Sequence, residues 1–272
     1  MAWLEISGTV GRVAACLGFF IAGMAIFYLL TKVIYRIPEK QQLERLHEPG
    51  KFRNAGIVIF GGVAAVLFTG FFGMGLQGII YFLFLAVLTV VTFIDMDTME
   101  IPFMLNVIIF VMGVVSLILQ FVSDAVPGSE FFAMDEVTIV SRLIGMICIS
   151  LPLYLIVLFI PEGFGGGDIK LMFAAGFLLG WKATVVGFFI GLILGGIYGV
   201  ICLVRRSHGK NDHFAFGPFL SVGLAIALFC GNIIMNHYID FIKAAMNPEI
   251  KKKLLVYSRE IEYTKGYGCL TR

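Results

Sequence analysis

Two short segments of this sequence carry acidic residues at the ends of strongly apolar stretches. Residues 93–102 read FIDMDTMEIP and contain Asp95 and Asp97, and residues 165–171 read GGGDIKL and contain Asp168. A carboxylate within or at the edge of a membrane-spanning helix is costly to bury, so it is a functional candidate by default. Chemistry is therefore expected at these two segments.

Asp95 and Asp168 are expected to form a catalytic pair. Two apolar stretches lie between them, and these would cross a membrane as a hairpin that returns the chain to the same face. Two carboxyl groups that meet at an apolar boundary cannot easily both ionise, so one keeps a proton while the other stays charged. Such a pair can activate water for attack on a peptide carbonyl while protonating its oxygen. This chemistry requires no metal ion, no cofactor and no covalent intermediate.

The residues around Asp168 favour a peptide substrate. Gly165, Gly166 and Gly167 lack Cβ atoms, so a substrate backbone could pass close to the carboxyl group. Lys170 could balance charge or contact a substrate carbonyl, although a lysine at the end of a span often only extends its ammonium to water. We therefore expect these glycines and Lys170 to bind the substrate.

Other uses of the same acidic residues remain open. Asp95 and Asp168 could relay protons or ions across a membrane in a secondary transporter. Asp95, Asp97 and Glu100 could hold Mg²⁺ for a lipid-phosphate transferase, although no second acidic cluster of that kind is present in the sequence. Asp97 and Glu100 could also do no more than solvate a tight polar turn.

The composition places the protein in a membrane. Of its 272 residues, 59% are hydrophobic and 14% are charged, whereas a soluble domain carries about 25% charged residues. The net charge of +2 is spread along the chain without a dense basic face, so no nucleic-acid partner is expected. The five cysteines form no CxxC pair, which argues against a thiolate zinc site and a disulfide framework. Soluble enzymes, secreted disulfide scaffolds and nucleic-acid binders are thereby excluded.

We predict an all-α, polytopic integral membrane protein with about eight transmembrane helices. A helix needs about 20 mostly apolar residues to cross the hydrocarbon layer of the bilayer. Residues 168–204 would extend about 55 Å as one helix, too long for one crossing of about 30 Å, and Gly180-Trp181-Lys182 offers a break. The predicted spans are residues 13–34, 54–74, 76–95, 102–122, 137–160, 168–180, 182–204 and 215–235.

A stripe of glycines marks the seventh predicted span. Gly187, Gly191, Gly195 and Gly199 recur at every fourth position. Residues four apart lie on one face of a helix, so these glycines form a smooth strip along it. We expect another helix to pack closely there.

The loop charges predict the orientation in the membrane. Residues 32–53 contain six Lys or Arg residues, whereas residues 123–136 contain four acidic residues and none that is basic. By the positive-inside rule the first of these loops is cytoplasmic. Alternating crossings then place Asp95 and Asp168 at the cytoplasmic face of the inner membrane.

Residues 1–235 are predicted to form one membrane domain, followed by a polar C-terminal tail of unknown role over residues 236–272. An even number of crossings puts this basic tail outside, against the positive-inside rule. Long segments follow that rule weakly. Seven crossings with a cytoplasmic tail are therefore the alternative.

In these motifs the chain resembles the type IV prepilin peptidases, which are bacterial members of the GxGD aspartyl protease group. Residues 93–102 are similar to the family's first aspartate segment, and residues 165–171 are similar to its GxGDxKL segment. Residues 216–220, FGPFL, are similar to the family's entry into the last span. Residues 33–38, VIYRIP, are similar to the end of its first span. The four matches follow the family's order and spacing.

The resemblance implies a membrane aspartyl endopeptidase in which Asp95 and Asp168 are catalytic, with Asp97 as the alternative for the first position. It implies that the substrates are prepilins or pseudopilins, the subunits of type IV pili and of protein secretion systems. These would be cut just after a glycine that ends a short basic leader, at the cytoplasmic face of the membrane. Asp97, Glu100 and Glu162 could attract such a leader, so Asp97 is also a candidate substrate-binding residue.

Two departures from the family's pattern narrow the prediction. Many bacterial members carry a cysteine tetrad after the first span, associated with methylation of the new N-terminus by S-adenosylmethionine, whereas residues 38–53 contain no cysteine. We therefore expect a peptidase without N-methyltransferase activity. Phe103 stands where the family usually has Asp or Asn, and this difference bears on substrate specificity.

A secondary transporter is the main alternative, and a catalytically silent relative that holds pilin subunits is a third. Transporters usually show interrupted helices near the bilayer midplane. Here the acidic residues lie at one face and the sequence shows no inverted repeat, which favours the protease. The sequence leaves the oligomeric state open.

Overall fold

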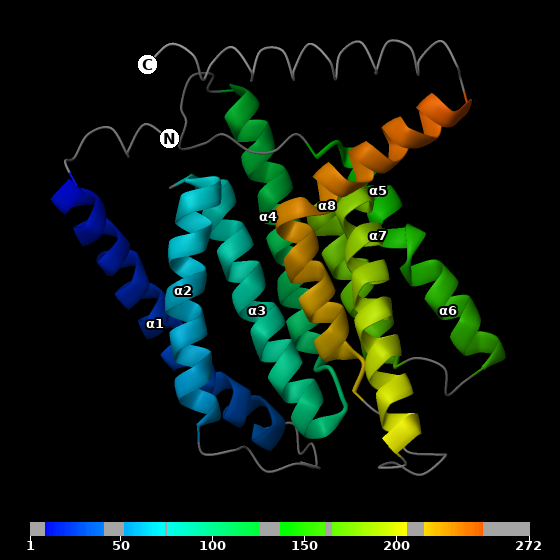
Figure 1. Ribbon diagram of the computed structural model, residues 1–272, viewed down its shortest axis with the longest axis horizontal. Helices are drawn as coiled ribbons and strands as arrows, with labels where there is room; N and C mark the ends of the chain where they lie inside the picture. The colour runs from blue at the N-terminus through cyan, green and yellow to red at the C-terminus, as the bar shows by residue number, and fades with distance from the viewer. Residues whose placement is uncertain are drawn as a thin grey trace.

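The computed structural model describes residues 9–40, 52–73, 75–125, 137–160, 165–205 and 215–246. Every helix or strand assigned within these ranges is an α-helix, and Figure 1 shows the helices gathered into a bundle. The helices are α1 (Thr9–Lys40), α2 (Arg53–Phe72), α3 (Leu76–Thr98), α4 (Phe103–Ala125), α5 (Ile139–Cys148), α6 (Ser150–Phe159), α7 (Gly166–Arg205) and α8 (Gly217–Met246).

The fold class predicted from the sequence is confirmed. In the described part of the chain, seven helical stretches are long and apolar enough to cross a membrane. One of them, Gly166–Cys202, joins the predicted sixth and seventh spans in α7. The others are Cys16–Lys40, Arg53–Phe72, Leu76–Thr98, Phe103–Ser123, Ile139–Phe159 and Gly217–Lys243.

The central helix of the bundle is α3. It packs against α1, α2, α4 and α8, and Figure 1 shows it between α2 and α4. On α3, at most 1% of the surface of each of four residues is exposed: Phe84, Leu88, Val91 and Ile94. Because neighbouring helices cover most of α3, the buried side of its last turn can carry polar side chains into the protein interior.

The long helix α7 reverses direction at Gly180, whose dihedral angles (φ 77°, ψ 169°) are not helical. Asp168 and Gly195 both lie near the start of α8. Asp168 is close to Asp95, which accepts a hydrogen bond from the Gly217 N–H, and Gly195 packs against the ring of Phe216. In a straight helix the segment from Asp168 to Gly195 would be about 40 Å long. Its two ends can meet only if α7 consists of two antiparallel halves, as the sequence predicted. The positive φ at the turn is readily adopted by glycine alone.

Arg142 of α5 satisfies the backbone at this reversal. A break in a helix leaves carbonyl groups without their usual partners, and the hydrocarbon core of a membrane offers no water in their place. The Arg142 side chain is 1% exposed, so all its N–H groups need acceptors inside the protein. They donate to the carbonyl oxygens of Val137 (3.3 Å), Phe177 (3.2 Å) and Leu178 (3.2 Å), to Ser116 Oγ (3.1 Å) and to Gln120 Oε1 (3.3 Å).

The predicted span over residues 137–160 is divided into α5 and α6 at Ile149. Pro152 has no N–H to donate to the carbonyl of Cys148, and its ring clashes with that carbonyl. The helix therefore breaks just before this proline, and Figure 1 shows α6 leaning outward from the bundle.

The expected close packing on the glycine stripe is seen between the second half of α7 and α8. A Cβ atom on Gly187 would lie 3.1 Å from Leu224 Cα, and one on Gly191 would lie 3.0 Å from Leu220 Cα. A Cβ atom on Gly223 of α8 would in turn clash with the carbonyl oxygen of Gly187. The backbones of α7 and α8 can approach this closely because both helices have glycine at the points of contact.

The last helix extends beyond the predicted end of its span. α8 continues from Gly217 to Met246, and its membrane-compatible part ends at Lys243. Residues 126–136 and 247–272 lie outside the described residues, as does Cys269. The division into a domain over residues 1–235 and a separate tail stays a prediction.

Replacing Arg142 with methionine is expected to lower the free energy of unfolding by about 3 kcal/mol, because several buried oxygen atoms lose their donors. Thermal unfolding of the purified protein in detergent measures this change. Lys182→Met is the control, since the Lys182 ammonium donates to Asn236 at an exposed position. Equal unfolding temperatures for the wild-type protein and Arg142→Met would contradict the role of Arg142.

The glycine stripe gives a prediction with a control on the same helix. Gly191→Leu is expected to separate α7 from α8 and so to reduce the yield of folded protein, whereas Gly196→Leu is expected to be tolerated. A Cβ atom on Gly196 would have no neighbour within 4 Å. Size-exclusion chromatography and thermal unfolding compare the two variants. Similar behaviour of both would show that α8 does not depend on the stripe.

Candidate active site

The first acidic segment forms the last turn of α3 and the link to α4. Asp95 and Asp97 are 5% and 2% exposed. The helix ends at Met99, which takes a left-handed conformation (φ 54°) and donates its N–H to the Asp95 carbonyl at 2.8 Å. Pro102 then precedes α4, because a proline there needs no hydrogen-bond partner for an N–H. This tight link holds Asp95 at the end of a rigid helix.

The carboxyl group of Asp95 is held by the start of α8. The Gly217 N–H donates to Asp95 Oδ2 at 3.0 Å. The first N–H groups of a helix have no partner within the helix, and they attract negative charge. Gly217 and Pro218 suit this contact: a Cβ atom on Gly217 would lie 2.6 Å from Asp95 Oδ2, and Pro218 adds no further unpaired N–H. The FGP segment is thereby explained as the donor that orients Asp95.

Asp168 lies in the first turn of α7 and faces Asp95. It is 5% exposed, and the two carboxyl groups are close enough to interact electrostatically. The Asp168 N–H donates to the Gly165 carbonyl at 3.1 Å, and its side-chain Oδ1 is buried without a hydrogen-bond partner. The structure therefore brings together the two aspartates that the sequence paired.

The three glycines before Asp168 have different surroundings. A Cβ atom on Gly167 would lie 2.8 Å from Ile101 Cβ, so close packing against the link between α3 and α4 accounts for this glycine. A Cβ atom on Gly165 would lie 3.2 Å from Asp168 Oδ2, and one on Gly166 would have no neighbour within 4 Å. Open space beside the aspartates therefore occurs at Gly166, with Gly165 at its edge.

Asp97 points to a different partner. Its Oδ1 accepts an ion-paired hydrogen bond from Arg53 Nη1 at 2.5 Å. The guanidinium carbon of Arg53 lies 5.4 and 5.5 Å from the ring centres of Tyr35 and Phe93, which cover the cation. Residues two apart on a helix do not share a face, so Asp95 and Asp97 serve separate contacts. The sequence reasoning did not pair Arg53 with an acid, although an arginine that opens a span is itself a signal for a buried ion pair.

Lys170 extends along the outside of α7. Its ammonium lies 5.3 Å from the centre of the Phe103 ring, a favourable cation–π distance. The predicted contacts of Lys170 and Asp97 with substrate stay predictions, and the partners that the structure gives them are Phe103 and Arg53.

The arrangement supports acid and base chemistry at one end of the bundle. Asp95 and Asp168 are both buried and lie close enough to interact. A backbone N–H holds Oδ2 of Asp95, and Oδ1 of Asp168 is buried without a hydrogen-bond partner. A Mg²⁺ site built from Asp95, Asp97 and Glu100 is not supported, because Asp97 is engaged by Arg53. Among the described residues, three or more His, Cys, Asp or Glu side chains do not gather at any point.

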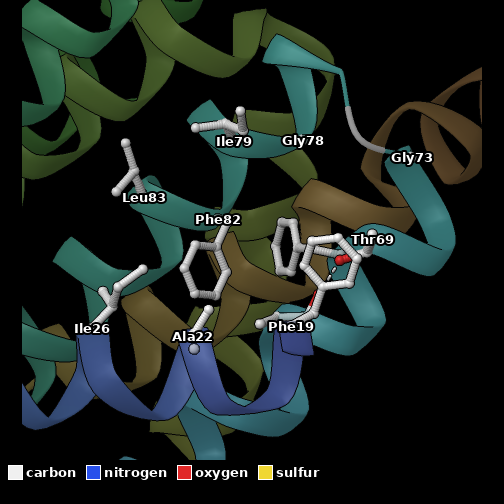
Figure 2. Close-up of a pocket in the computed structure, with 12 residues that line it drawn as sticks. Phe19, Ala22, Ile26, Thr69, Gly73, Gly78, Ile79, Phe82 and Leu83 are labelled. Carbon is white, nitrogen blue, oxygen red and sulfur yellow. Dashed lines mark hydrogen bonds between the residues drawn. The ribbon is translucent and has the colours of Figure 1, made fainter. Parts of the chain in front are cut away.

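A separate hollow lies between α1, α2 and α3, away from the aspartates. Figure 2 shows its apolar lining, which includes Phe19, Phe82 and Leu83, and its volume is about 250 Å³. The hydroxyl of Thr69, the polar group drawn there, donates to the Ala65 carbonyl at 2.5 Å. This hollow offers no group for catalysis, so it is not part of the candidate site.

The region that holds both aspartates is similar to a known protein family. A model of the type IV leader peptidase family matches residues 82–200. This match covers α4 to α6 together with most of α3 and α7, and therefore Asp95 and Asp168.

Several curated proteins are similar to this chain. The "Prepilin leader peptidase/N-methyltransferase" of Aeromonas salmonicida is 30% identical over 157 residues, which cover 57% of this chain and 50% of that protein. The protein of the same name from Aeromonas hydrophila is 29% identical over 153 residues, covering 56% of this chain and 50% of that protein. The one from Bacillus subtilis is 35% identical over 77 residues, or 28% of this chain and 31% of that protein.

This chain thus spans about half the length of the Aeromonas relatives. No solved structure matches it.

The ion pair of Arg53 and Asp97 is expected to stabilise the fold as a unit. Asp97→Asn or Arg53→Met alone leaves one buried charge or polar partner uncompensated and should lower the free energy of unfolding by about 3 kcal/mol. The double variant removes both and should lose less than the sum of the two single changes. Thermal unfolding of the four proteins measures the coupling. Strictly additive losses would show that the two side chains act independently.

Proposed function

We propose a function for this chain on the ground that its residues 82–200 match a model of the type IV leader peptidase family. The protein is a membrane-embedded aspartyl endopeptidase of the inner membrane. It cleaves the basic leader of type IV prepilins or pseudopilins after a glycine. The observation that carries this proposal is the meeting of two buried aspartates, Asp95 and Asp168, at one end of the helix bundle.

Asp95 and Asp168 share the proton transfers of peptide hydrolysis. The charged carboxylate takes a proton from a water molecule, and the water oxygen bonds to the peptide carbonyl carbon. The protonated carboxyl group gives its proton to the carbonyl oxygen, which forms a neutral tetrahedral intermediate. The C–N bond then breaks as the proton taken from water passes to the leaving nitrogen. A proton from the intermediate returns to the other carboxylate, so the pair ends as it began.

The neighbours of the aspartates support this assignment. The Gly217 N–H fixes one oxygen of Asp95, which leaves the rest of that carboxyl group available to the reactants. The space beside Gly166 and the edge at Gly165 would let an extended peptide backbone approach Asp168. Lys170, on the next turn of α7, is available to a substrate carbonyl. Glu100 is exposed beside the site and would favour a basic leader, while Glu162 lies outside the described residues.

The active site faces the cytoplasm in this proposal. The basic segment over residues 32–53 begins in the last turns of α1, and the end of α3 and the starts of α4, α7 and α8 lie on the side of the bundle where α1 ends (Figure 1). The positive-inside rule places that side in the cytoplasm. A leader that remains in the cytoplasm would meet the aspartates there.

We also propose that the protein lacks N-methyltransferase activity. In this it would differ from the relatives, whose names include that activity. The support is the absence of cysteine from residues 38–53, between the first and second spans.

A proton-relay transporter receives less support. Asp95, Asp97 and Asp168 all lie at one end of the bundle, and Asp97 is already paired. A relay needs ionisable groups in sequence across the membrane.

Asp95→Asn and Asp168→Asn are each expected to reduce cleavage by about 100-fold or more, because each removes one of the two proton carriers without changing side-chain volume. The intact mass of a co-expressed model prepilin, with a basic leader ending in glycine, measures the product. Wild-type protein should trim the leader without adding the mass of a methyl group. Asp97→Asn should retain cleavage.

Asp240→Asn, near the far end of α8, is the matched control and should cleave as the wild type does. Cleavage by both Asp95→Asn and Asp168→Asn would refute the pair. If Asp97→Asn alone lost cleavage, Asp97 rather than Asp95 would be the first catalytic residue. An uncut prepilin with verified wild-type protein would overturn the proposed function, and a methylated product would overturn the absence of methyltransferase activity.

A further inference from the structure

We propose that a groove on the lipid side of the bundle binds the apolar helix of the peptide substrate, next to the cleavage site. This inference rests on the proposed function and deepens it, because it assigns the part of the substrate that the aspartates do not hold. The groove lies between α4, the end of α5, α6 and the first half of α7 and is called the lipid-side groove below. It is lined by Phe103, Asn106, Val107, Phe110, Ile147, Ser150, Leu151, Tyr154, Ile169, Lys170, Phe173 and Ala174.

One end of the lipid-side groove is next to the catalytic pair. Ile169 and Lys170, which line it, directly follow Asp168 on α7. Phe103, on the opposite wall, opens α4 just after the link that packs against Gly167. The groove therefore ends at the first turns of α7 and α4, and Asp168 lies in that same first turn of α7.

The size of the groove follows from the break between α5 and α6. Because α6 leans outward, it packs on α7 without closing onto α4. The volume of the groove is about 730 Å³, within the range of about 300–1,000 Å³ typical of ligand pockets. Along α4 the lining runs from Phe103 to Phe110, a rise of about 10 Å or two helical turns. The groove therefore suits the side chains along about two turns of a helix.

The groove opens to the membrane. Val107, Leu151 and Tyr154 line it and are 37%, 49% and 56% exposed, and α4 and α6 belong to spans whose outer faces meet lipid. An apolar substrate helix already lies in the membrane, so it can enter sideways without passing through water.

Asn106 favours a peptide over a lipid chain as the occupant. Its side chain is 3% exposed, and both its amide oxygen and its amide nitrogen lack hydrogen-bond partners. An unpaired amide buried in an apolar site destabilises the fold unless an occupant supplies partners. The first turn of a helix offers unpaired N–H groups, and the residue before it offers a carbonyl. A lipid acyl chain offers neither.

Lys170 separates the two parts of the substrate. Its ammonium lies over the Phe103 ring at the end of the groove that adjoins Asp168. This positive charge repels a basic leader and admits an apolar segment. The leader is thus directed away from the lipid side, and the junction of leader and helix falls at the aspartates.

Blocking the groove should therefore affect a substrate with its helix more than a substrate without it. The experiment compares kcat/KM for a full-length prepilin with kcat/KM for a short peptide that contains the leader and cleavage site alone. Val107→Trp fills the groove and should lower the ratio of the two values about ten-fold. Asn106→Leu should lower it about five-fold, because the amide can no longer pair with the substrate backbone.

Val115→Trp is the matched control, since Val115 lies two turns further along α4 outside the groove and is 43% exposed. Its ratio should stay within two-fold of the wild-type value. Equal ratios for Val107→Trp and Val115→Trp would refute the groove while the proposed function stands. A wild-type protein that cleaves neither substrate would refute the proposed function instead.

Photo-crosslinking provides a measurement that does not depend on activity. p-Benzoylphenylalanine at position 107, in an Asp168→Asn background that leaves the substrate uncut, should attach to the first two turns of the substrate helix. The same probe at position 115 should not. Attachment from position 107 to phospholipid alone would show that the groove holds lipid, and it would overturn the inference.

Discussion

The hydrogen bonds of Arg142 hold together the part of the molecule that most needs support. Inside a membrane, a helix can reverse only if the backbone groups released at the turn find other partners. Arg142 supplies those partners to Phe177 and Leu178 and ties α4 to the same point through Ser116. The cation is buried, and its cost is offset because its donors meet five oxygen acceptors. Without this contact, the carbonyl groups of Phe177 and Leu178 would lose the donor that Arg142 supplies at the reversal.

The position of the aspartate pair, Asp95 and Asp168, follows from that reversal. The first half of α7 begins with Asp168, and the second half returns to the same end of the bundle, where α8 starts. The glycine faces of α7 and α8 then set how closely the Gly217 N–H approaches Asp95. The Arg142 hydrogen bonds at one end of the bundle and the close α7–α8 interface thus define the positions of the two aspartates at the other end.

The sequence predicted the helices, the break near Gly180, close helix packing on the glycine stripe and the meeting of Asp95 with Asp168, because these depend on apolar length, glycine spacing and crossing parity. It did not predict the break at Ile149, although Pro152 carried the signal for it. The partners of Arg53 and Arg142 were also missed, since a partner distant along the chain leaves no local pattern that identifies it. The groove at Asn106 depends on the tilt of α6, which no periodicity encodes.

The bond from Gly217 to Asp95 joins residues 122 positions apart. A ribosome has made both aspartates well before it makes the residue that orients the first of them. A nascent chain that ends within α7 therefore contains the acidic pair but lacks the backbone donor, and the wall that α8 forms beside the pair is missing as well. The order of synthesis itself delays assembly of the site until the last helix has joined the bundle, so the growing chain carries an incomplete site for most of its time in the translocation machinery.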